Sequence, residues 1–345
     1  MVGMRDVAKK AGVSLSTVSL VVNGNGYVSD DMRERVRKAM QALNYVPNEL
    51  ARNLYHDCTN LVGVIVPTIR HPFFATFTAH LQHALAAQGL RTMLCSTADE
   101  ADGEIQYVDM LRRHMMDGIV MCAHTSHPGD YWTSIHRPIV AFDRVLGDGI
   151  SSIGSDHEQG GRLIAQMLIR NGARHVVMIG GPRDQFFDLA VRGEVEEGSF
   201  DLGKTTFPTV RYYLTLEQEL TSAGVKYEYI EAGEVMDFAG YHRAVSRALD
   251  GVATDGVDAV VSSDIGAAFC VREALSRGIS IPDELQVVAY DGTYLTDMAG
   301  LRLTAVCQDF DALAGTAVAR MMDAIEGRPV DSAGDVIPVS LREAD

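Results

Sequence analysis

Charged, amide and aromatic side chains follow the short apolar runs of residues 61–308, and their types suit a small polar ligand. The candidate binding residues of this kind are His71, Phe73, Phe74, Asp143, Arg144, Asp264, Asp291 and Gln308. Vicinal hydroxyl groups can bridge a carboxylate and a guanidinium, and the apolar face of a ring can stack on phenylalanine. Because a nonpolar ligand would not need so many charged groups, the set predicts a polyhydroxy ligand.

The elements that must position these side chains are alternating strands and helices. From Leu61 onward, short apolar runs such as Leu61–Pro67 and Leu285–Tyr290 alternate with helical stretches such as Glu158–Arg170. Repeated strand–helix units predict an α/β fold with doubly wound parallel sheets, in which ligands bind at the carboxyl ends of the strands. About ten such strands would be generous for a single open sheet, so we expect two lobes with one sheet each.

The beginning of the chain has a different pattern, which predicts an all-α head of three short helices. Arg5–Ala11 and Leu15–Val22 are compact amphipathic segments, and a third helix is expected over Asp31–Leu43. Gly12 permits a left-handed turn after the first helix, and Ser14 is a good N-cap for the second. Two small helices joined by such a turn have helix-turn-helix geometry, in which the second helix can enter the major groove of DNA.

The charge of the chain is divided between this head and the remainder. Residues 1–58 contain eight Lys/Arg and six Asp/Glu, a net +2 within a total of −16, so the remaining residues carry −18. The acidic total alone would argue against a nucleic-acid partner, but the head is slightly basic.

Composition excludes several classes of protein. No apolar run approaches the ~18–20 residues of a membrane span, and the N-terminus lacks the apolar core of a signal peptide. The five cysteines are far apart and form no CxxC pair. We therefore expect a cytoplasmic protein with reduced thiols and no membrane partner, and neither a disulfide scaffold nor a zinc finger.

Three short motifs resemble catalytic or metal sites but lack the rest of such sites. Residues 198–205 have P-loop spacing, yet the stretch before them is charged rather than an apolar strand. The pairs His80-x-x-His83 and His124-x-x-His127 have ligand-like spacing without an obvious third ligand. No GxSxG elbow occurs. We expect no enzymatic activity, no cofactor and no metal.

The head carries strings that belong together: Asp6–Ser14, Ser16–Ser19, Val21–Asn23 and Leu43–Asn48. In this combination it closely resembles the start of the LacI family of transcriptional regulators. The resemblance implies a helix-turn-helix DNA-binding domain over residues 1–47. It also implies a hinge helix and linker over residues 48–60.

The same resemblance implies roles for individual residues of the head. Leu15 and Ser16 would open the recognition helix and face base edges. Leu20 stands where the family usually has arginine, so the bidentate guanine contact of an arginine is not expected there. Leu54 would wedge into the minor groove at the operator centre. The residues expected to position phosphates are Ser19, Asn23, Ser29, Tyr45 and Asn48.

The body resembles the effector domain of the same family and the periplasmic sugar-binding proteins. The matching strings are Val64–Pro67, His71–Phe74, Ala141–Arg144, Val288–Thr293 and Gln308–Phe310. The resemblance implies an effector-binding and dimerisation domain over residues 61–345. Lobe 1 is expected at about 61–157 and 292–320, and lobe 2 at about 158–291 and 321–345.

Within that family the combination that looks most like the ribose-binding branch is Phe73, Phe74, Asp143, Arg144, Arg211, Asp291 and Gln308. His71 and Ser263 stand where that branch tends to have asparagine, so another pentose or a hexose is as plausible as ribose. Residues 183–210 depart from the family pattern as an insertion near the cleft mouth. Surface decoration is the expected role of this insertion, and gating of the ligand is the alternative.

Together these features predict a homodimeric regulator that represses sugar-utilisation genes. Its head would bind near-palindromic operator DNA, and a small sugar bound between the lobes would release it. Two alternatives remain open: a corepressor-dependent regulator of the same fold, and a stand-alone sugar-binding protein.

Overall fold

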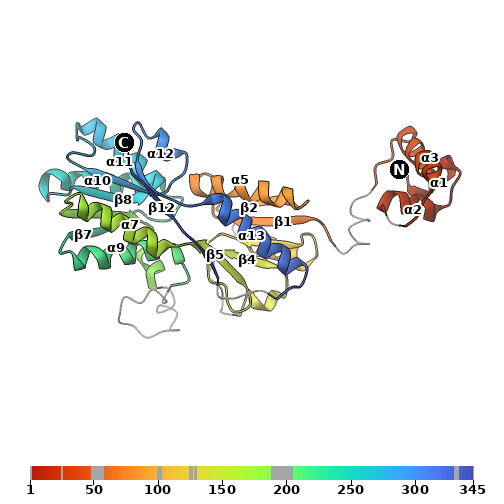
Figure 1. The fold of residues 1–345 in the computed structure, drawn as a ribbon, viewed down its shortest axis with the longest axis horizontal. Coiled ribbons are helices and arrows are strands. Elements are labelled where there is room, and N and C mark those ends of the chain that lie inside the picture. Colours follow the sequence, from red (N-terminus) through yellow and green to blue (C-terminus); the bar gives the residue numbers. More distant parts are fainter. Residues whose placement is uncertain are drawn as a thin grey trace. The chain divides into compact units, whose positions relative to one another are not determined.

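The structure is a computed structural model of the 345-residue chain, and it describes residues 2–24, 26–47, 58–98, 103–123, 127, 130–187, 205–329 and 334–344. The chain divides into two compact units, Met1–Thr59 and Asn60–Asp345, which are described separately (Figure 1). Within the described ranges, no helix has the length and apolar character needed to cross a bilayer.

The first unit contains the three helices expected from the sequence. They are α1 (Met4–Ala11), α2 (Leu15–Asn23) and α3 (Asp30–Ala42). Val7, Val18 and Val36, one from each helix, are fully buried and form the centre of a small core. Packing of one apolar stripe from each helix is what makes helices this short stable.

The turn between α1 and α2 is fixed by local chemistry. Gly12 has a φ of 65°, in the left-handed region that favours glycine. The Ser14 hydroxyl accepts from the Thr17 amide at 3.1 Å, which confirms it as the N-cap of α2. From α3, the guanidinium Nη2 of Arg35 donates to the carbonyl oxygens of Ala11 at 2.7 Å and Gly12 at 3.0 Å. These bonds attach the turn to the third helix.

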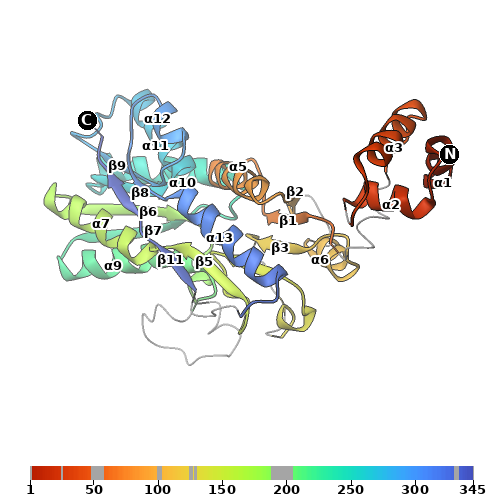
Figure 2. The same cartoon turned by 45° about the vertical axis from the view of Figure 1, so that its right-hand side comes forward.

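The first lobe of the second unit is a six-stranded parallel sheet with the order β11-β5-β4-β3-β1-β2. Its strands are β1 (Leu61–Val66), β2 (Arg91–Ser96), β3 (Gly118–Met121), β4 (Ile139–Phe142), β5 (Ser151–Ser155) and β11 (Asp335–Ile337). One face is covered by α5 (Pro72–Ala87) and α13 (Phe310–Ile325), which lie side by side in Figures 1 and 2. The other face packs against α6 (Ile105–Arg112) and the short helix Thr133–Ile135.

The second lobe is also a six-stranded sheet, with the order β12-β10-β9-β8-β6-β7. Its strands are β6 (His175–Gly180), β7 (Lys226–Glu231), β8 (Ala259–Ser263), β9 (Gln286–Asp291), β10 (Thr304–Cys307) and the antiparallel β12 (Ser340–Arg342). Helices α7 (His157–Arg170) and α9 (Arg211–Ser222) cover one face. Helices α10 (Phe238–Thr254) and α11 (Asp264–Arg277) cover the other, and α12 (Leu295–Met298) packs beside α11.

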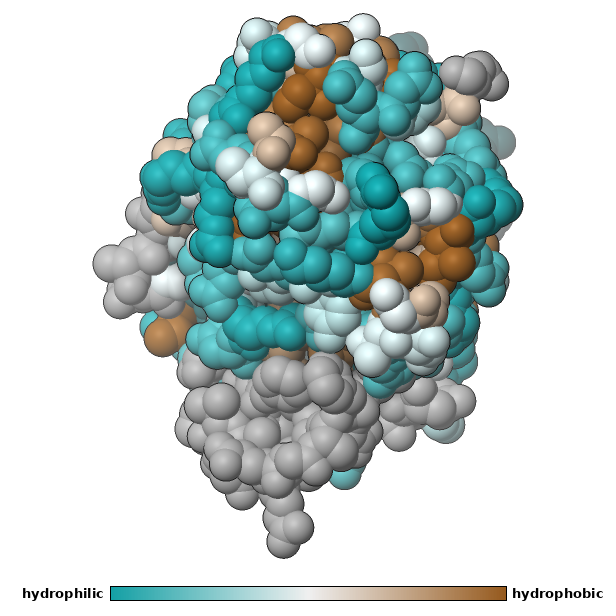
Figure 3. All heavy atoms as spheres, turned by 90° about the vertical axis from the view of Figure 1, so that its left-hand side faces the viewer, coloured by the Kyte–Doolittle hydropathy of each residue, from teal (hydrophilic) through white to brown (hydrophobic). Residues whose placement is uncertain are grey.

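The face of the second lobe shown in Figure 3 is mostly hydrophilic. It is mainly teal, with separate hydrophobic patches rather than one continuous apolar area. This agrees with the acidic character of the chain after the head.

Two doubly wound sheets agree with the predicted fold class, but the chain changes lobe later than expected. Residues 292–307 were expected in lobe 1, yet β10 pairs in parallel with β9 and belongs to the second sheet. Residues 321–337 were expected in lobe 2, yet α13 continues unbroken to Ile325 and β11 pairs with β5 in the first sheet. The reason is that the buried face of α13, which includes Leu313 and Met321, packs as one surface on the first lobe.

Candidate functional site

The exposed start of α2 carries the residues expected to face base edges. Leu15 is 44% exposed, and Ser16 is exposed beside the capping residue Ser14, with 2.7 Å between their hydroxyl oxygens. Leu20 is exposed one turn further along. An apolar side chain presented in this way can contact a thymine methyl group but cannot donate to guanine.

The residues expected to contact phosphate occupy three places in the head. Asn23 and Ser19 are half-buried neighbours on α2, and the Asn23 amide donates to the Ser19 hydroxyl at 3.2 Å. Ser29 is the N-cap of α3 and accepts from the Met32 amide at 3.4 Å. Tyr45 packs against the head core, and burial raises the pKa of its hydroxyl. Asn48 and Leu54, and with them most of the predicted hinge, lie outside the described residues.

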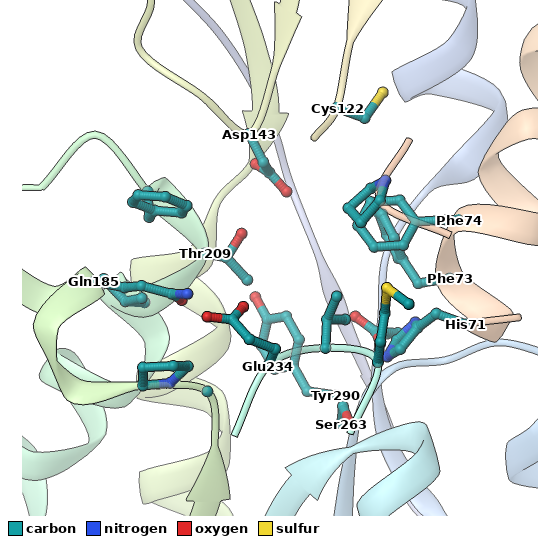
Figure 4. A pocket seen from close by; sticks show the side chains of 18 of the residues that line it. His71, Phe73, Phe74, Cys122, Asp143, Gln185, Thr209, Glu234, Ser263 and Tyr290 are labelled. Atoms are coloured by element: carbon teal, nitrogen blue, oxygen red, sulfur yellow. The ribbon is translucent and has the colours of Figure 1, made fainter. Parts of the chain in front are cut away.

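A cavity of about 360 Å³ lies between the two lobes of the second unit, at the carboxyl ends of the strands. Seven of the nine predicted ligand residues line it: His71, Phe73, Phe74, Asp143, Arg144, Asp291 and Gln308. In Figure 4, His71, Phe73 and Phe74 lie on one side and Gln185, Thr209 and Glu234 on the other, with Asp143 between them. The strand ends thus bring together most of the residues that the sequence singled out.

The first-lobe wall is built by the start of α5. Pro72 is at the first helical position, and the next two residues, Phe73 and Phe74, pack edge to face with 5.2 Å between ring centroids. Phe73 also packs against Phe142, from the end of β4, with 5.8 Å between the ring centroids. Such edge-to-face packing holds the rings rigidly, so they offer a fixed apolar surface to the cavity.

His71 places an unpaired polar atom in the same wall. Its side chain is buried, and Nδ1 has no hydrogen-bond partner among the described residues. Burial lowers the pKa of the imidazole to about 4, so it is neutral at ordinary pH. A buried ring nitrogen without a partner is costly, and a ligand hydroxyl group could supply the missing bond.

The carboxylates of the cavity are held by neighbouring side chains. Asp143 follows β4 with a φ of 45°, and its Oδ1 lies 2.9 Å from Nε2 of His157. Asp291 ends β9 and accepts from the side-chain amide of Gln308 at 2.9 Å. Burial, together with the charge of nearby Asp264, raises the pKa of Asp291 well above its ordinary value.

Arg144 is one of the two arginines predicted for the site, and it is fixed in place. Nε donates to the carbonyl oxygen of Ala123 at 3.2 Å, and Nη1 donates to that of Asp143 at 2.5 Å. Its guanidinium lies over the ring of Phe207, 4.6 Å from the centroid. Because Phe207 belongs to the second lobe, this contact also joins the two walls.

Two predicted ligand residues, Asp264 and Arg211, do not line this cavity. Asp264 is fully buried at the start of α11, where it accepts from the Gly292 amide at 3.2 Å and the Thr293 amide at 2.6 Å. Burial raises its pKa to about 6. It supports the turn after Asp291 and does not line the cavity.

Arg211 lies on a different surface because it begins α9. Its Nη1 lies 4.0 Å from Oε1 of Glu158, and the side chain lines a separate cavity of about 400 Å³ that also includes Arg162. The single helical turn Pro208–Val210 precedes Arg211. Thr209 and Val210 of this turn line the cleft, where Arg211 was expected.

The sequence reasoning missed the aromatic wall of the second lobe. The rings that line it are Phe186, Phe207, Tyr212, Tyr213, Tyr229, Tyr241 and Tyr290. Three of the tyrosine hydroxyls are bonded within the protein: Tyr213 to the Ile179 carbonyl at 2.8 Å, Tyr229 to the Gly181 carbonyl at 2.7 Å, and Tyr290 to His157 at 2.7 Å. The position of Tyr290 directly before Asp291 was a signal that could have identified it.

The described ends of the stretch 183–210 also line the cleft, through Gln185, Phe186, Phe207, Thr209 and Val210. Pure surface decoration was therefore the wrong expectation for these ends. Residues 188–204, including most of the P-loop-like motif, lie outside the described part of the chain.

One histidine of each pair has an ordinary hydrogen-bond partner, and His83 is exposed on α5. His80 bonds to Asp311 at 2.7 Å, and His127 bonds to Glu104 at 2.5 Å; His124 lies outside the described residues. Among the described residues, no group of three His, Cys, Asp or Glu side chains could hold a metal ion.

Three family models together match nearly the whole chain. Residues 3–48 match the model of bacterial regulatory proteins of the lacI family. Residues 59–202 match the model of periplasmic binding proteins and sugar binding domain of LacI family, and residues 165–343 match a periplasmic binding protein-like domain.

Individual relatives cover the same length. The ribose operon repressor of Halalkalibacterium halodurans is 31% identical over 99% of this chain and 96% of its own length. The sucrose operon repressor of Pediococcus pentosaceus is 33% identical over 94% of this chain and 92% of its own length.

Solved structures share the fold. A periplasmic binding protein/LacI transcriptional regulator from Alkaliphilus metalliredigens, solved with D-xylulofuranose, has a TM-score of 0.69 at 25% identity, covering 83% of this chain and 98% of its own. The Lac repressor bound to ONPG has a TM-score of 0.79 at 22% identity, and the match covers 99% of this chain and 98% of the repressor chain. With its head, its two-lobed body and relatives that match from end to end, the chain belongs to the LacI family of bacterial regulatory proteins, and it is a DNA-binding transcriptional regulator rather than an enzyme.

Proposed function

We propose that this regulator represses sugar-utilisation genes as a cytoplasmic homodimer, and that a small sugar bound between its lobes releases it from operator DNA. The observation that carries the sugar assignment is the cleft itself. It sets fixed carboxylates beside rigid aromatic faces, and it leaves Nδ1 of His71 without a partner.

The arrangement of the cleft suits a ring with one polar edge and one apolar face. Asp143, Asp291 and Gln308 supply acceptors and a donor for hydroxyl groups, while Phe73 and Phe74 offer apolar surface. The bonded tyrosine hydroxyls leave mainly ring carbons on the opposite wall, which favours stacking. The names of the two operon repressors and the D-xylulofuranose complex support sugars as the class to test first.

The head supports operator binding through α2. Leu15 and Ser16 are exposed at its first turn, where side chains of a recognition helix contact base edges. Each head would contact one half-site, so a homodimer would recognise a near-palindromic sequence.

The two activities are coupled by linkage. A sugar can release the operator only if it binds more tightly to the form that does not bind DNA, and the operator must then weaken sugar binding by the same factor. The lobes are joined by three connections, after β5, β10 and β11, so a ligand that contacts both walls can shift their arrangement.

A two-stage experiment on the full-length protein tests this function. Selection from random duplex DNA defines the operator, and a thermal-shift panel containing D-ribose, sucrose and further mono- and disaccharides identifies the sugar. Electrophoretic mobility shifts with and without that sugar then show whether the sugar weakens or strengthens operator binding. We expect the sugar to release the operator. Tighter operator binding with sugar would instead establish the corepressor mode. Failure of the selection to yield any bound duplex would contradict the proposal.

Paired variants locate the sugar site. Asp143→Asn, within the cleft, is expected to lose the thermal shift, whereas Arg211→Ala, on the separate cavity, is expected to keep it. The reverse pattern would move the site away from the cleft.

A further inference from the structure

A buried hydrogen-bond chain joins the two lobes beside the ligand cleft, with His157 in the middle. Nε2 of His157 lies 2.9 Å from Oδ1 of Asp143, and Nδ1 lies 2.7 Å from the hydroxyl oxygen of Tyr290. The exposed fractions of Asp143, His157 and Tyr290 are 5%, 2% and 1%. Both bonds are therefore shielded from water, where hydrogen bonds are strong and their loss is costly.

The three residues come from both lobes and from a connection between them. Asp143 follows β4 of the first lobe, and Tyr290 lies in β9 of the second. His157 begins α7, two residues after the chain leaves β5 of the first lobe. The chain of bonds therefore spans a place where the lobes would have to move relative to one another.

One arrangement of protons satisfies both bonds. With its proton on Nε2, the imidazole donates to the Asp143 carboxylate, and Nδ1 accepts from the Tyr290 hydroxyl. Replacing either end would leave the histidine with an unpaired buried nitrogen.

Two glycines leave the space that this chain occupies. A Cβ atom on Gly154 would lie 2.3 Å from Oδ1 of Asp143, and one on Gly160 would lie 2.7 Å from the hydroxyl oxygen of Tyr290. Any larger residue at either position would force one end of the chain to move. The backbone at this connection is therefore shaped around the two hydrogen bonds.

The two ends of this hydrogen-bond chain line the ligand cleft, but its middle residue does not. Asp143 and Tyr290 line the cleft, while His157 lies on the separate cavity that also contains Arg211. Tyr290 in turn stacks on Tyr212, with ring centroids 3.8 Å apart and an angle of 9° between the planes. A ligand contacting Asp143 is thus connected through His157 to the aromatic wall opposite.

We propose that His157 is a positioning residue for the effector response. It stabilises the lobe arrangement seen in this structure by tying Asp143 to Tyr290, and so it sets how strongly sugar binding is coupled to release of DNA. The coupling part of this inference rests on the proposed function, whereas the positioning part concerns only the hydrogen bonds of His157 with Asp143 and Tyr290.

Variants of the full-length protein separate positioning from simple loss of stability. His157→Phe removes both bonds and keeps a ring, and Tyr290→Phe removes one end and keeps the stacking on Tyr212. His175→Phe is the matched control, because His175 is a buried histidine of the second lobe away from Asp143 and Tyr290. Its Nδ1 lies 3.1 Å from the carbonyl oxygen of Asp255, and the substitution removes this bond. His157→Gln retains a donor and an acceptor and serves as the rescue variant.

Amide hydrogen exchange in segments 151–161 and 286–293 is the direct readout. We expect about tenfold faster exchange in His157→Phe and in Tyr290→Phe, and no further increase when the two substitutions are combined. In His157→Gln the exchange rate should return partly toward that of the wild type. Additive effects, unchanged exchange in both single variants, or an equal effect in His175→Phe would overturn the positioning role.

The second readout is the coupling itself, measured with D-ribose and sucrose as probes. The ratio of operator affinities without and with sugar should fall at least fivefold in His157→Phe, and an unchanged ratio would overturn the coupling role. If neither sugar releases the wild-type protein, the proposed effector class has failed for these probes, while hydrogen exchange still decides the role of His157.

Discussion

Gln308 holds Asp291 in the ligand cleft: its side-chain nitrogen donates to Oδ1 of Asp291 at 2.9 Å. The oxygen of the same amide accepts from the Ser155 hydroxyl at 2.6 Å. Ser155 ends β5 and Gln308 follows β10, so this amide links two of the connections between the lobes. Asp291, which lines the cleft, is therefore oriented by two of the segments that connect the lobes.

Replacing Gln308 by leucine should therefore weaken sugar binding. The Asp291 carboxyl would lose its donor and its pKa would rise further, and an unsatisfied buried group costs about 1–3 kcal/mol. We expect roughly tenfold lower affinity in calorimetric titration, since 1.4 kcal/mol corresponds to a factor of ten. Gln286→Leu, at the start of β9 and outside the cleft, is the control and should bind normally. Equal losses in both variants would show that the effect is not specific to Asp291.

Protonation of His71 should reduce stability in mild acid. Burial lowers the folded pKa to about 4 from an ordinary value of 6.5, so the unfolded chain takes up a proton first as the pH falls. The stability associated with the neutral form is complete above the unfolded pKa and is lost as the pH falls toward 4. Between pH 7 and pH 5 this difference in pKa predicts that the free energy of unfolding falls by roughly 2 kcal/mol.

Urea unfolding at the two pH values measures that loss. His71→Asn should remove most of it, whereas His83→Asn, which changes an exposed histidine on the same helix, should leave it in place. An identical pH dependence in the wild type and His71→Asn would contradict the assignment.

Residues on the exposed face of α2 should control operator recognition independently of the sugar. Leu15→Ala removes the apolar surface at the start of the helix, and we expect about tenfold weaker operator binding. Leu20→Arg introduces a side chain that can bond guanine bidentately, so the selected operator should gain a guanine at one symmetric position. Both variants should keep the wild-type thermal shift with sugar, and a lost shift would show that the head change had disturbed the body.

Arg35 should stabilise the head without affecting the cleft. Arg35→Ala loses the bonds to the carbonyl oxygens of Ala11 and Gly12, so DNA binding should fall at least tenfold while the sugar response is retained. Lys38→Ala loses only an exposed pair with Glu34, at 3.6 Å, and should bind DNA normally. DNA binding in Arg35→Ala at the wild-type level would show that the turn does not depend on these bonds.

The head could be predicted from the sequence because its signals are local. Gly12 and Ser14 determine a turn and a cap within a few residues, and all three expected helices are present. The strand–helix alternation likewise predicted two doubly wound sheets, since each unit is contiguous in the chain.

The differences between expectation and structure concern features that depend on distant packing. Asp264 follows a strand, as a ligand residue would, but whether its side chain turns toward the cleft or toward Thr293 depends on the neighbouring turn. The tyrosine wall was missed because Tyr212 and Tyr229 come from separate elements that meet only in the folded lobe. The late change of lobe at Cys307 depends on the pairing of β10 with β9, which no local pattern encodes.

Calorimetry of sugar binding to the full-length protein, with and without saturating operator duplex, decides whether the cleft and the head are linked. We expect the operator to weaken sugar binding by the same factor by which the sugar weakens operator binding, at least fivefold in each direction. Equal sugar affinity in the two titrations would show that the two sites are not linked.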